Sequence, residues 1–157
     1  MTYLHDTLDN YRKFGGFDYS QVEIPNYITD NLKWPLRPYQ IEAFQRHIAV
    51  VENEFDEKPG KPMHLVYNMA TGSGKTYIMA GLILHMDRQG YRNFLFFVHT
   101  VNILEKTKMN FLTKGENKYL FTDTINIDGK EVFIKQIENF SDADEENINI
   151  KFMTIGG

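Results

Sequence analysis

Residues 69–76, Met-Ala-Thr-Gly-Ser-Gly-Lys-Thr, place the strongest constraint on how this chain can fold. Glycines 72 and 74 lie in a short turn that follows an apolar run, His64–Met69, and precedes a helical pattern of apolar residues. Glycines let backbone N–H groups approach phosphate oxygens, and the start of a helix adds unpaired N–H groups and a partial positive charge. The pattern therefore predicts a buried strand, a phosphate-binding loop and a helix, in that order.

Each residue type in this loop has a distinct chemical use. The backbone of residues 71–74 (Thr71, Gly72, Ser73, Gly74) would surround the phosphates, and Lys75 would reach the β- and γ-phosphates as the main catalytic cation. The Thr76 hydroxyl would ligate Mg²⁺. A purely structural glycine turn is the alternative, but the flanking strand and helix patterns favour nucleotide binding.

The remainder of the chain alternates helical and strand patterns. Apolar residues at steps of three and four predict a helix from Pro38 to Phe55, whereas Asn93–His99 is a second buried strand and Val101–Leu112 a second helix. A strand–helix–strand–helix order indicates an α/β fold with a mostly parallel sheet flanked by helices. Residues 1–35 are aromatic and irregular, with short helices expected at residues 4–14 and 27–32.

The last third of the chain has a different pattern. Asp128-Gly129 between residues 122–127 and 131–134 predicts a hairpin. Residues 141–147 form an acidic loop, and residues 148–155 are a final strand.

Charge and composition narrow the possible functions. The 157-residue chain has a net charge of −4, yet residues 63–118 carry seven basic and three acidic side chains, which suits a polyanion. There are no cysteines, so disulfides, thiol catalysis and cysteine metal sites are excluded. No signal peptide and no membrane-length apolar run is present, and we expect a cytoplasmic protein with no membrane partner.

Met69 stands where nucleotide kinases and small GTPases usually have the first glycine of this motif. The octapeptide as it stands resembles motif I of superfamily-two helicases, and in particular the motor of the type III restriction enzyme R (Res) subunit. Arg37-Pro38-Tyr39-Gln40 is similar to an element of that superfamily that lies beside adenine. By this resemblance Gln40 would read the adenine edge and Arg37 would support the adenine pocket, with ATP and Mg²⁺ as cofactors.

Two further segments fit the same resemblance. Thr100 and Asn102, with Lys106 nearby, stand where motif Ia contacts the nucleic-acid backbone, and Thr154 stands near motif Ib. At Thr100 and Asn102 a capping threonine and a solvated helix face remain an equal alternative. The resemblance covers residues 36–157 and implies the first, RecA-like lobe of a P-loop NTPase motor, preceded by an extension at residues 1–35.

The resemblance implies an ATP-dependent DNA translocase of a restriction system, with duplex DNA and a DNA-methyltransferase subunit as partners. The acidic motif of such motors is not apparent, because Asp87 lies on the helix leaving the loop and Asp144-Glu145-Glu146 follows no apolar strand. We therefore expect a lobe incomplete at its C-terminus that hydrolyses little ATP by itself. Three alternatives stay open: another superfamily-two DNA-repair or RNA helicase, a small-molecule P-loop kinase, and a module that binds nucleotide without turnover.

Overall fold

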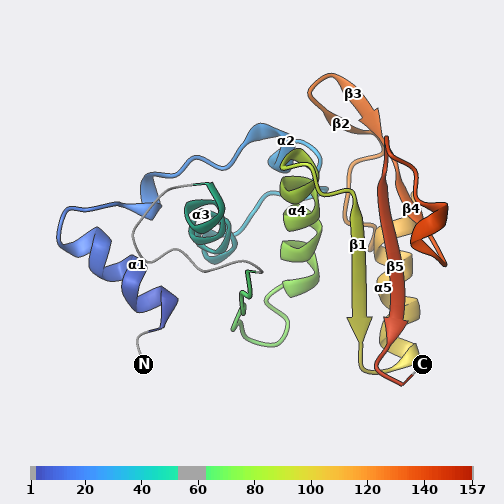
Figure 1. The fold of residues 1–157 in the computed structure, drawn as a ribbon, viewed down its shortest axis with the longest axis horizontal. Coiled ribbons are helices and arrows are strands. Elements are labelled where there is room, and N and C mark those ends of the chain that lie inside the picture. Colours follow the sequence, from blue (N-terminus) through green and yellow to red (C-terminus); the bar gives the residue numbers. More distant parts are fainter. Residues whose placement is uncertain (1–2, 53–62, 157) are drawn as a thin grey trace. The chain divides into compact units, whose positions relative to one another are not determined.

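The computed structural model describes residues 3–52 and 63–156, which form two compact units (Figure 1). Of the described residues, 3–25, 36–52 and 63–78 belong to the first unit, and 26–35 and 79–156 belong to the second. Phe55, predicted at the end of the long helix, lies outside the described residues. Within the two described ranges, no helix has the length and apolar character needed to cross a membrane.

The first unit is built around one long helix. This helix, α3 (Pro38–Glu52), begins at a proline, whose missing N–H group costs nothing in the first turn. Helix α1 (Leu4–Lys13) and the short 3₁₀ helix η1 (Tyr19–Gln21) pack beside it. Their shared core contains Leu8, Tyr19, Ala49 and Val50, so α1 and η1 are packed parts of this unit.

Helix α4 (Lys75–Arg88) follows the glycine-bearing loop and ends two residues before Gly90. Gly90 has a φ of 95°, in the left-handed region that favours glycine after a helix. The N–H of Tyr91 donates to the carbonyl of Met86 at 2.9 Å, which closes the last turn. Met79 is 41% exposed, whereas Ala80 and Leu84 are fully buried on the packed side of α4.

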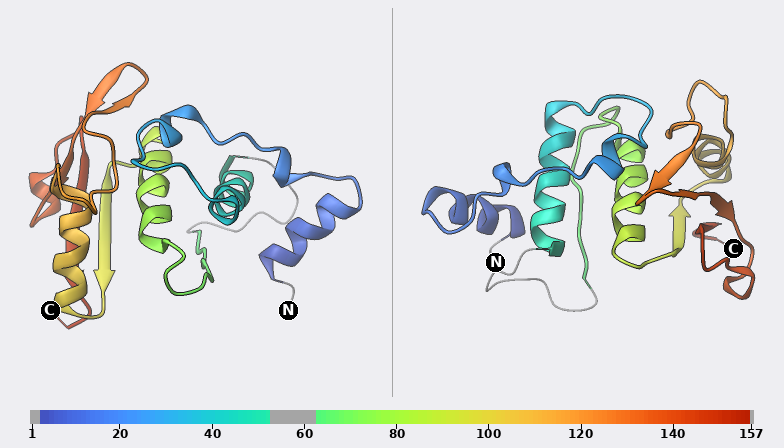
Figure 2. Two further views of the ribbon diagram at one scale, coloured as in Figure 1. Left: turned by 180° about the vertical axis from the view of Figure 1, so that it is seen from behind. Right: turned by 90° about the horizontal axis from the view of Figure 1, so that it is seen from above.

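A parallel sheet organises the second unit. Its strand order is β1 (Asn93–Val98), β5 (Ile148–Thr154) and β4 (Ile134–Gln136), with β5 in the centre and both pairings parallel. Helix α5 (Val101–Leu112) lies along one face of this sheet (Figure 2). The Phe111 ring packs 5.8 Å from the Phe96 ring and 6.4 Å from the Phe152 ring. The predicted α/β fold with a parallel sheet and flanking helices is confirmed.

The predicted hairpin is present but shorter than expected. Strands β2 (Ile125–Ile127) and β3 (Lys130–Val132) pair antiparallel around Asp128 and Gly129, whose φ values of 55° and 80° suit a tight hairpin turn. Ile134 was predicted in this hairpin but belongs to β4. The chain leaves the hairpin at Phe133, whose N–H donates to the Asn147 side chain at 2.9 Å.

Residues 26–35 join the second unit through a buried asparagine. Asn31, just after α2 (Asn26–Thr29), is 3% exposed. Its side-chain nitrogen donates to the carbonyls of Tyr27 (2.7 Å) and Asn126 (2.8 Å), and its side-chain oxygen accepts from the N–H of Asn126 (2.8 Å). A single side chain thus connects this early segment to the hairpin strand β2.

Candidate nucleotide-binding site

The loop before α4 has the backbone conformation that its two glycines allow. Gly72 and Gly74 have φ values of 80° and 83°, which side chains with a Cβ rarely adopt. A Cβ at Gly72 would meet nothing within 4 Å, whereas one at Gly74 would lie 2.7 Å from Nε2 of Gln40. Gly74 therefore satisfies two requirements, the left-handed backbone and the close approach of Gln40.

The helix that follows presents unpaired backbone donors. The Gly74 carbonyl is the first acceptor of α4, taking hydrogen bonds from the N–H groups of Tyr77 (2.9 Å) and Ile78 (3.1 Å). The N–H groups of Lys75 and Thr76 precede these donors and have no acceptor within the helix. Together with the helix dipole they favour an anion at this end of α4.

Lys75 lies over the loop. Its Nζ donates to the carbonyls of Met69 at 2.9 Å and Ala70 at 3.0 Å, so the ammonium group is held above the turn. The hydroxyl of Ser73 is buried and has no hydrogen-bond partner among the described residues. A buried orphan hydroxyl, an ammonium group and a helix N-terminus converge here, and this donor set fits a phosphate group.

Gln40 connects this loop to the start of α3. The Gln40 side chain is 4% exposed; its Nε2 donates to the Ser73 carbonyl at 3.1 Å, and its Oε1 accepts from the Arg37 N–H at 3.0 Å. Sequence reasoning placed Gln40 against adenine without anticipating these contacts. The structure brings Gln40 and the phosphate loop into direct contact, and its adenine role stays a prediction.

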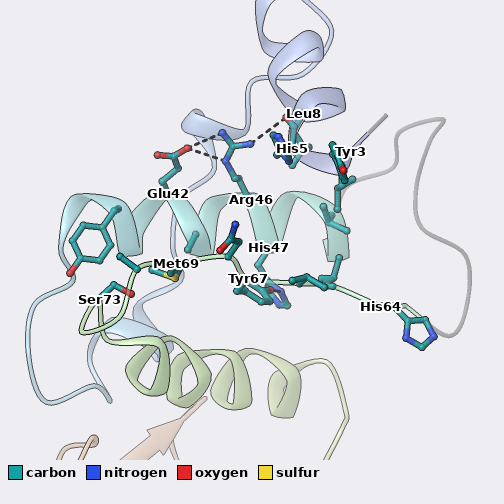
Figure 3. Close-up of a pocket in the computed structure, with 18 of the residues that line it drawn as sticks. Tyr3, His5, Leu8, Glu42, Arg46, His47, His64, Tyr67, Met69 and Ser73 are labelled. Carbon is teal, nitrogen blue, oxygen red and sulfur yellow. Dashed lines mark hydrogen bonds and ion pairs between the residues drawn. The ribbon is translucent and has the colours of Figure 1, made fainter. Parts of the chain in front are cut away.

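A cavity of about 950 Å³ extends from this loop along α3 (Figure 3). One wall is the segment from His64 to Ser73, another is the N-terminal half of α1, and the floor is a face of α3. The face carries Tyr39, Glu42, Ala43 and Arg46, which are spaced three and four apart and therefore lie on the same side of the helix. A mainly apolar cavity with a few polar groups is typical of a small-molecule site.

The segment before the loop does not form the buried strand that its apolar residues predict. Residues 64–69 are extended, but they pair with no strand among the described residues, and the Val66 side chain is 93% exposed. Leu65 packs instead on the helical core, and the Tyr67 hydroxyl lies 2.6 Å from Nδ1 of His47. The physical reason is that the described part of the first unit contains helices and no strand, so no neighbouring backbone is available.

Burial raises the pKa of Tyr67, so its hydroxyl stays protonated and can donate to the His47 ring. This hydrogen bond holds the extended segment against α3. It thereby fixes the chain that leads into the phosphate loop.

The predicted nucleic-acid contacts gather at one edge of the sheet in the second unit. Thr100 is the N-cap of α5, and its hydroxyl accepts from the N–H of Ile103 at 3.4 Å. Thr154 pairs with Val98, the last residue of β1, so it lies beside the turn that leads to Thr100. Asn102 and Lys106 are exposed on one face of α5. Ligands of parallel sheets bind outside the carboxyl ends of the strands, and these residues lie at that end of the sheet.

Asp87 is remote from the phosphate loop. It lies in the last turn of α4, twelve residues and therefore about 18 Å along the helix from Lys75. It is 5% exposed, and burial raises the pKa of its carboxyl group, partly offset by Arg92 at 3.9 Å. Asp87 therefore has no place in phosphate chemistry at this loop.

Two carboxylates of the acidic loop are paired with lysines of neighbouring strands. It begins at η2 (Phe140–Asp142), and Asp144 accepts from Nζ of Lys135, from the Glu146 N–H at 2.8 Å and from the Asn147 side chain at 3.0 Å. Lys130 donates to Glu146 at 3.0 Å. These bonds, with Lys135 first, lower the pKa of Asp144. These ion pairs attach the loop to β3 and β4.

Comparisons with known proteins agree with this geometry. Residues 33–156 match the family described as type III restriction enzyme, res subunit. The chain belongs to this family. It is 38% identical over 136 residues to a Haemophilus influenzae protein named probable type III restriction-modification enzyme HindVIP Res subunit. That alignment covers 84% of this chain and 26% of the relative, so the chain spans about a quarter of the relative's length. No solved structure matches the chain.

Membership of the Res family confirms the P-loop NTPase fold class and the link to restriction systems that the octapeptide predicts. The alternative of a small-molecule kinase is not supported, because the matched family is that of a restriction-enzyme subunit. The roles of individual residues in this Res-family chain are not tested by the match and stay predictions.

Sequence reasoning missed one polar cluster beside the site. Arg46 Nη2 donates to Asp9 (2.9 Å), to the Tyr19 hydroxyl (2.6 Å) and to Glu42 (2.8 Å), and its guanidinium lies 4.2 Å from the Tyr19 ring centroid. These contacts attach α1 and η1 to α3. Glu42 and Arg46 at i and i+4 of one helix were the available signal, but their partners lie far away in sequence.

Proposed function

We propose that this chain is the ATP-binding part of an ATP-dependent DNA motor in a restriction enzyme subunit. The observation that carries the proposal is the loop of residues 69–76, in which two left-handed glycines, the Lys75 ammonium group and the N-terminus of α4 converge. Family membership supports the same function, since Res subunits belong to restriction enzymes.

The residues present fit the triphosphate of ATP with its Mg²⁺. The backbone of Thr71–Gly74 and the N–H groups of Lys75 and Thr76 would hold the phosphate oxygens, and Lys75 would exchange its loop carbonyls for the β- and γ-phosphates. The Thr76 hydroxyl would be a metal ligand. Bound MgATP would supply the phosphoanhydride bond whose hydrolysis drives such motors.

DNA would bind at the other candidate site. Thr100, Asn102, Lys106 and Thr154 lie at or near one sheet edge in the second unit, where hydroxyl, amide, ammonium and helix N-terminal donors are available to phosphates. The Haemophilus relative is named as a subunit of a restriction-modification enzyme, and from this name we infer a DNA-methyltransferase subunit as a second partner.

The nucleotide part of this proposal is tested by competition between ATP and GTP. A site that hydrogen-bonds a particular group rejects ligands that lack it. We expect the parent chain to prefer ATP and the Gln40→Ala variant to lose the preference. Equal binding of both nucleotides by the parent would refute the adenine role of Gln40, and no binding of either would refute the proposed function.

Turnover is a separate expectation. No acidic motif of such motors is apparent in the sequence, and positioning with charge stabilisation is nearly all of phosphoryl-transfer catalysis. We expect the 157-residue chain to release little phosphate from ATP, with or without duplex DNA. Robust DNA-stimulated release that disappears in Lys75→Ala would show that a catalytic carboxylate had been overlooked.

A further inference from the structure

Lys33 and Trp34 form an exposed pair of a cation and an aromatic ring in the second unit. The Lys33 Nζ lies 5.1 Å from the Trp34 ring centroid and donates to the carbonyls of Glu116 at 3.1 Å and Asn117 at 3.3 Å. Trp34 is 42% exposed, although its ring is large and apolar. The pair is therefore attached to the turn of residues 113–118 while the ring remains in contact with solvent.

The same turn carries a second pair of this kind. The Lys114 Nζ lies 5.5 Å from the ring centroid of Phe133, which is 44% exposed. Lys118 is exposed as well, and within the described ranges Lys33, Lys114 and Lys118 form no ion pair with a carboxylate. Glu116 is the only acidic residue of the turn, so three lysines face one carboxylate. We call the surface made by Lys33, Trp34, residues 113–118 and Phe133 the aromatic–lysine face.

The aromatic–lysine face and the predicted DNA contacts lie at opposite ends of the sheet. Thr154 is the last residue of β5 and Thr100 follows the end of β1, so both stand at the carboxyl ends of the strands. Phe133 directly precedes β4 and stands at the amino ends. Helix α5 runs from one end of the sheet toward the other, and its 12 residues span about 18 Å. The two surfaces are therefore separate.

We propose that the aromatic–lysine face binds a single-stranded segment of DNA, with phosphates at the lysines and unpaired bases stacked on Trp34 and Phe133. The inference rests on the proposed function only in taking DNA as the polymer that this chain meets. It adds a contact surface that neither the motif resemblance nor the family match assigns.

The combination of rings and cations selects the partner. Lysines alone would suit any polyanion. Surfaces that bind single strands combine positive charge for the phosphates with exposed aromatic rings, because every base has a π face. Acidic side chains of a protein have no flat group for the rings, and a duplex keeps its bases stacked on one another. An unpaired strand is therefore the ligand that uses both features of the face.

The face is organised without a ligand. Tyr119, which follows the turn, is 3% exposed, and its ring packs 5.8 Å from the Phe121 ring. The N–H of Leu120 donates to the Asn110 carbonyl at 3.0 Å, and the N–H of Lys33 donates to the Leu120 carbonyl at 3.0 Å. These contacts fix both segments that carry the lysines, which lowers the entropic cost of binding.

The intrinsic fluorescence of the chain tests the stacking directly, because Trp34 is its single tryptophan. We expect an oligothymidylate of about 16 nucleotides, long enough to cover a single-strand site, to quench the Trp34 emission. A duplex of the same length and poly-L-glutamate should leave the emission nearly unchanged. Absence of quenching by the oligothymidylate would overturn the proposal. Equal quenching by poly-L-glutamate would also overturn it, and would indicate a surface for acidic proteins.

Anisotropy of a labelled oligothymidylate tests the same face by substitution. We expect Trp34→Ala to weaken binding by about tenfold, and Lys118→Ala to reduce the slope of log affinity against log salt by about 0.7. Phe140→Ala is the control for the ring, since Phe140 is a 45% exposed aromatic residue of the same unit outside the face. Lys135→Ala is the control for charge, since Lys135 is an exposed lysine paired with Asp144.

Equal losses in Trp34→Ala and Phe140→Ala, or equal slopes in Lys118→Ala and Lys135→Ala, would each contradict the proposed contact. Failure of the proposed function has a different signature. It would appear as absence of MgATP binding by the parent chain, whereas binding of the oligothymidylate and quenching of Trp34 would persist.

Discussion

Replacing Gly74 with alanine tests how the phosphate loop is held against α3. A Cβ at position 74 would lie 2.7 Å from Nε2 of Gln40, and the backbone φ is 83°. Gly72 is the matched control, because its φ of 80° is nearly the same but a Cβ there meets nothing within 4 Å. The two substitutions therefore differ in one respect, the displacement of Gln40.

The expected loss of stability has two contributions, the left-handed backbone and the displacement of Gln40. A side chain in the left-handed region costs about 1–2 kcal/mol, and both variants carry this cost. In Gly74→Ala the Gln40 amide must also move, which breaks its bonds to the Ser73 carbonyl and to the Arg37 N–H. At about 1 kcal/mol for each bond, Gly74→Ala should be less stable than Gly72→Ala by about 2 kcal/mol.

Urea unfolding of the two variants, alone and combined with Gln40→Ala, measures this difference. Removing the Gln40 amide makes room for the new methyl group, so the difference between the two glycine variants should disappear in the Gln40→Ala background. Equal destabilisation by Gly72→Ala and Gly74→Ala in the parent would refute the idea that Gln40 restricts position 74.

Three further outcomes are expected. Asn31→Ala should lower the free energy of unfolding by about 2–3 kcal/mol, since the N–H and carbonyl groups of Asn126 lose the buried Asn31 side chain as their partner. Asp30→Ala, at an exposed position, is the control, and equal effects of the two substitutions would contradict the bridging role of Asn31. The pKa of Asp144 is lowered in the folded chain, so the stability that its carboxylate contributes is present above its ordinary pKa of 3.8 and is lost as the pH falls below that value. The melting temperature of Asp144→Asn should therefore depend less on pH in the acid range than that of the parent, and the same pH dependence in both would contradict this role. If Lys106 contacts a DNA phosphate, Lys106→Ala should reduce the slope of log affinity against log salt by about 1 in an anisotropy titration, and an unchanged slope would argue against the contact.

The elements predicted most successfully are those with strong local signals. Helix α5 begins after a capping threonine, and Asp128-Gly129 forms the hairpin turn, because a capping hydroxyl and a glycine at positive φ favour these backbone conformations whatever packs around them. The parallel order of β1 and β5 was also accessible, since a strand, a helix and a later strand allow few arrangements.

The strand predicted at residues 64–69 shows what a local pattern cannot supply. Its apolar residues favour an extended chain, and the chain is extended, but pairing depends on a second backbone that the pattern does not contain. Here Leu65 packs against the helical core instead, and the Tyr67 hydroxyl hydrogen-bonds to His47 of α3. Tertiary partners decide whether an extended segment becomes a strand.

The candidate site also has parts that local sequence predicts and parts that depend on tertiary contacts. The phosphate loop was predictable because glycine spacing and a lysine at a helix start encode its chemistry locally. The contact between Gln40 and Ser73, the attachment of Arg46 to Asp9 and the bridge from Asn31 to Asn126 join residues 33 to 95 positions apart. Such contacts depend on the three-dimensional path of the chain, which the residue types leave open.

Calorimetric titration of MgATP into the parent chain and into Lys75→Ala tests the central claim most directly, namely that residues 69–76 bind the triphosphate of ATP. Hydrogen bonds from a charged group contribute about 1.5–3 kcal/mol, so we expect ATP to bind the parent and its affinity to fall by about 10- to 100-fold in Lys75→Ala. Lys114→Ala, at an exposed lysine of the second unit, should bind ATP as the parent does. Equal ATP affinity of the parent and Lys75→Ala would contradict the account.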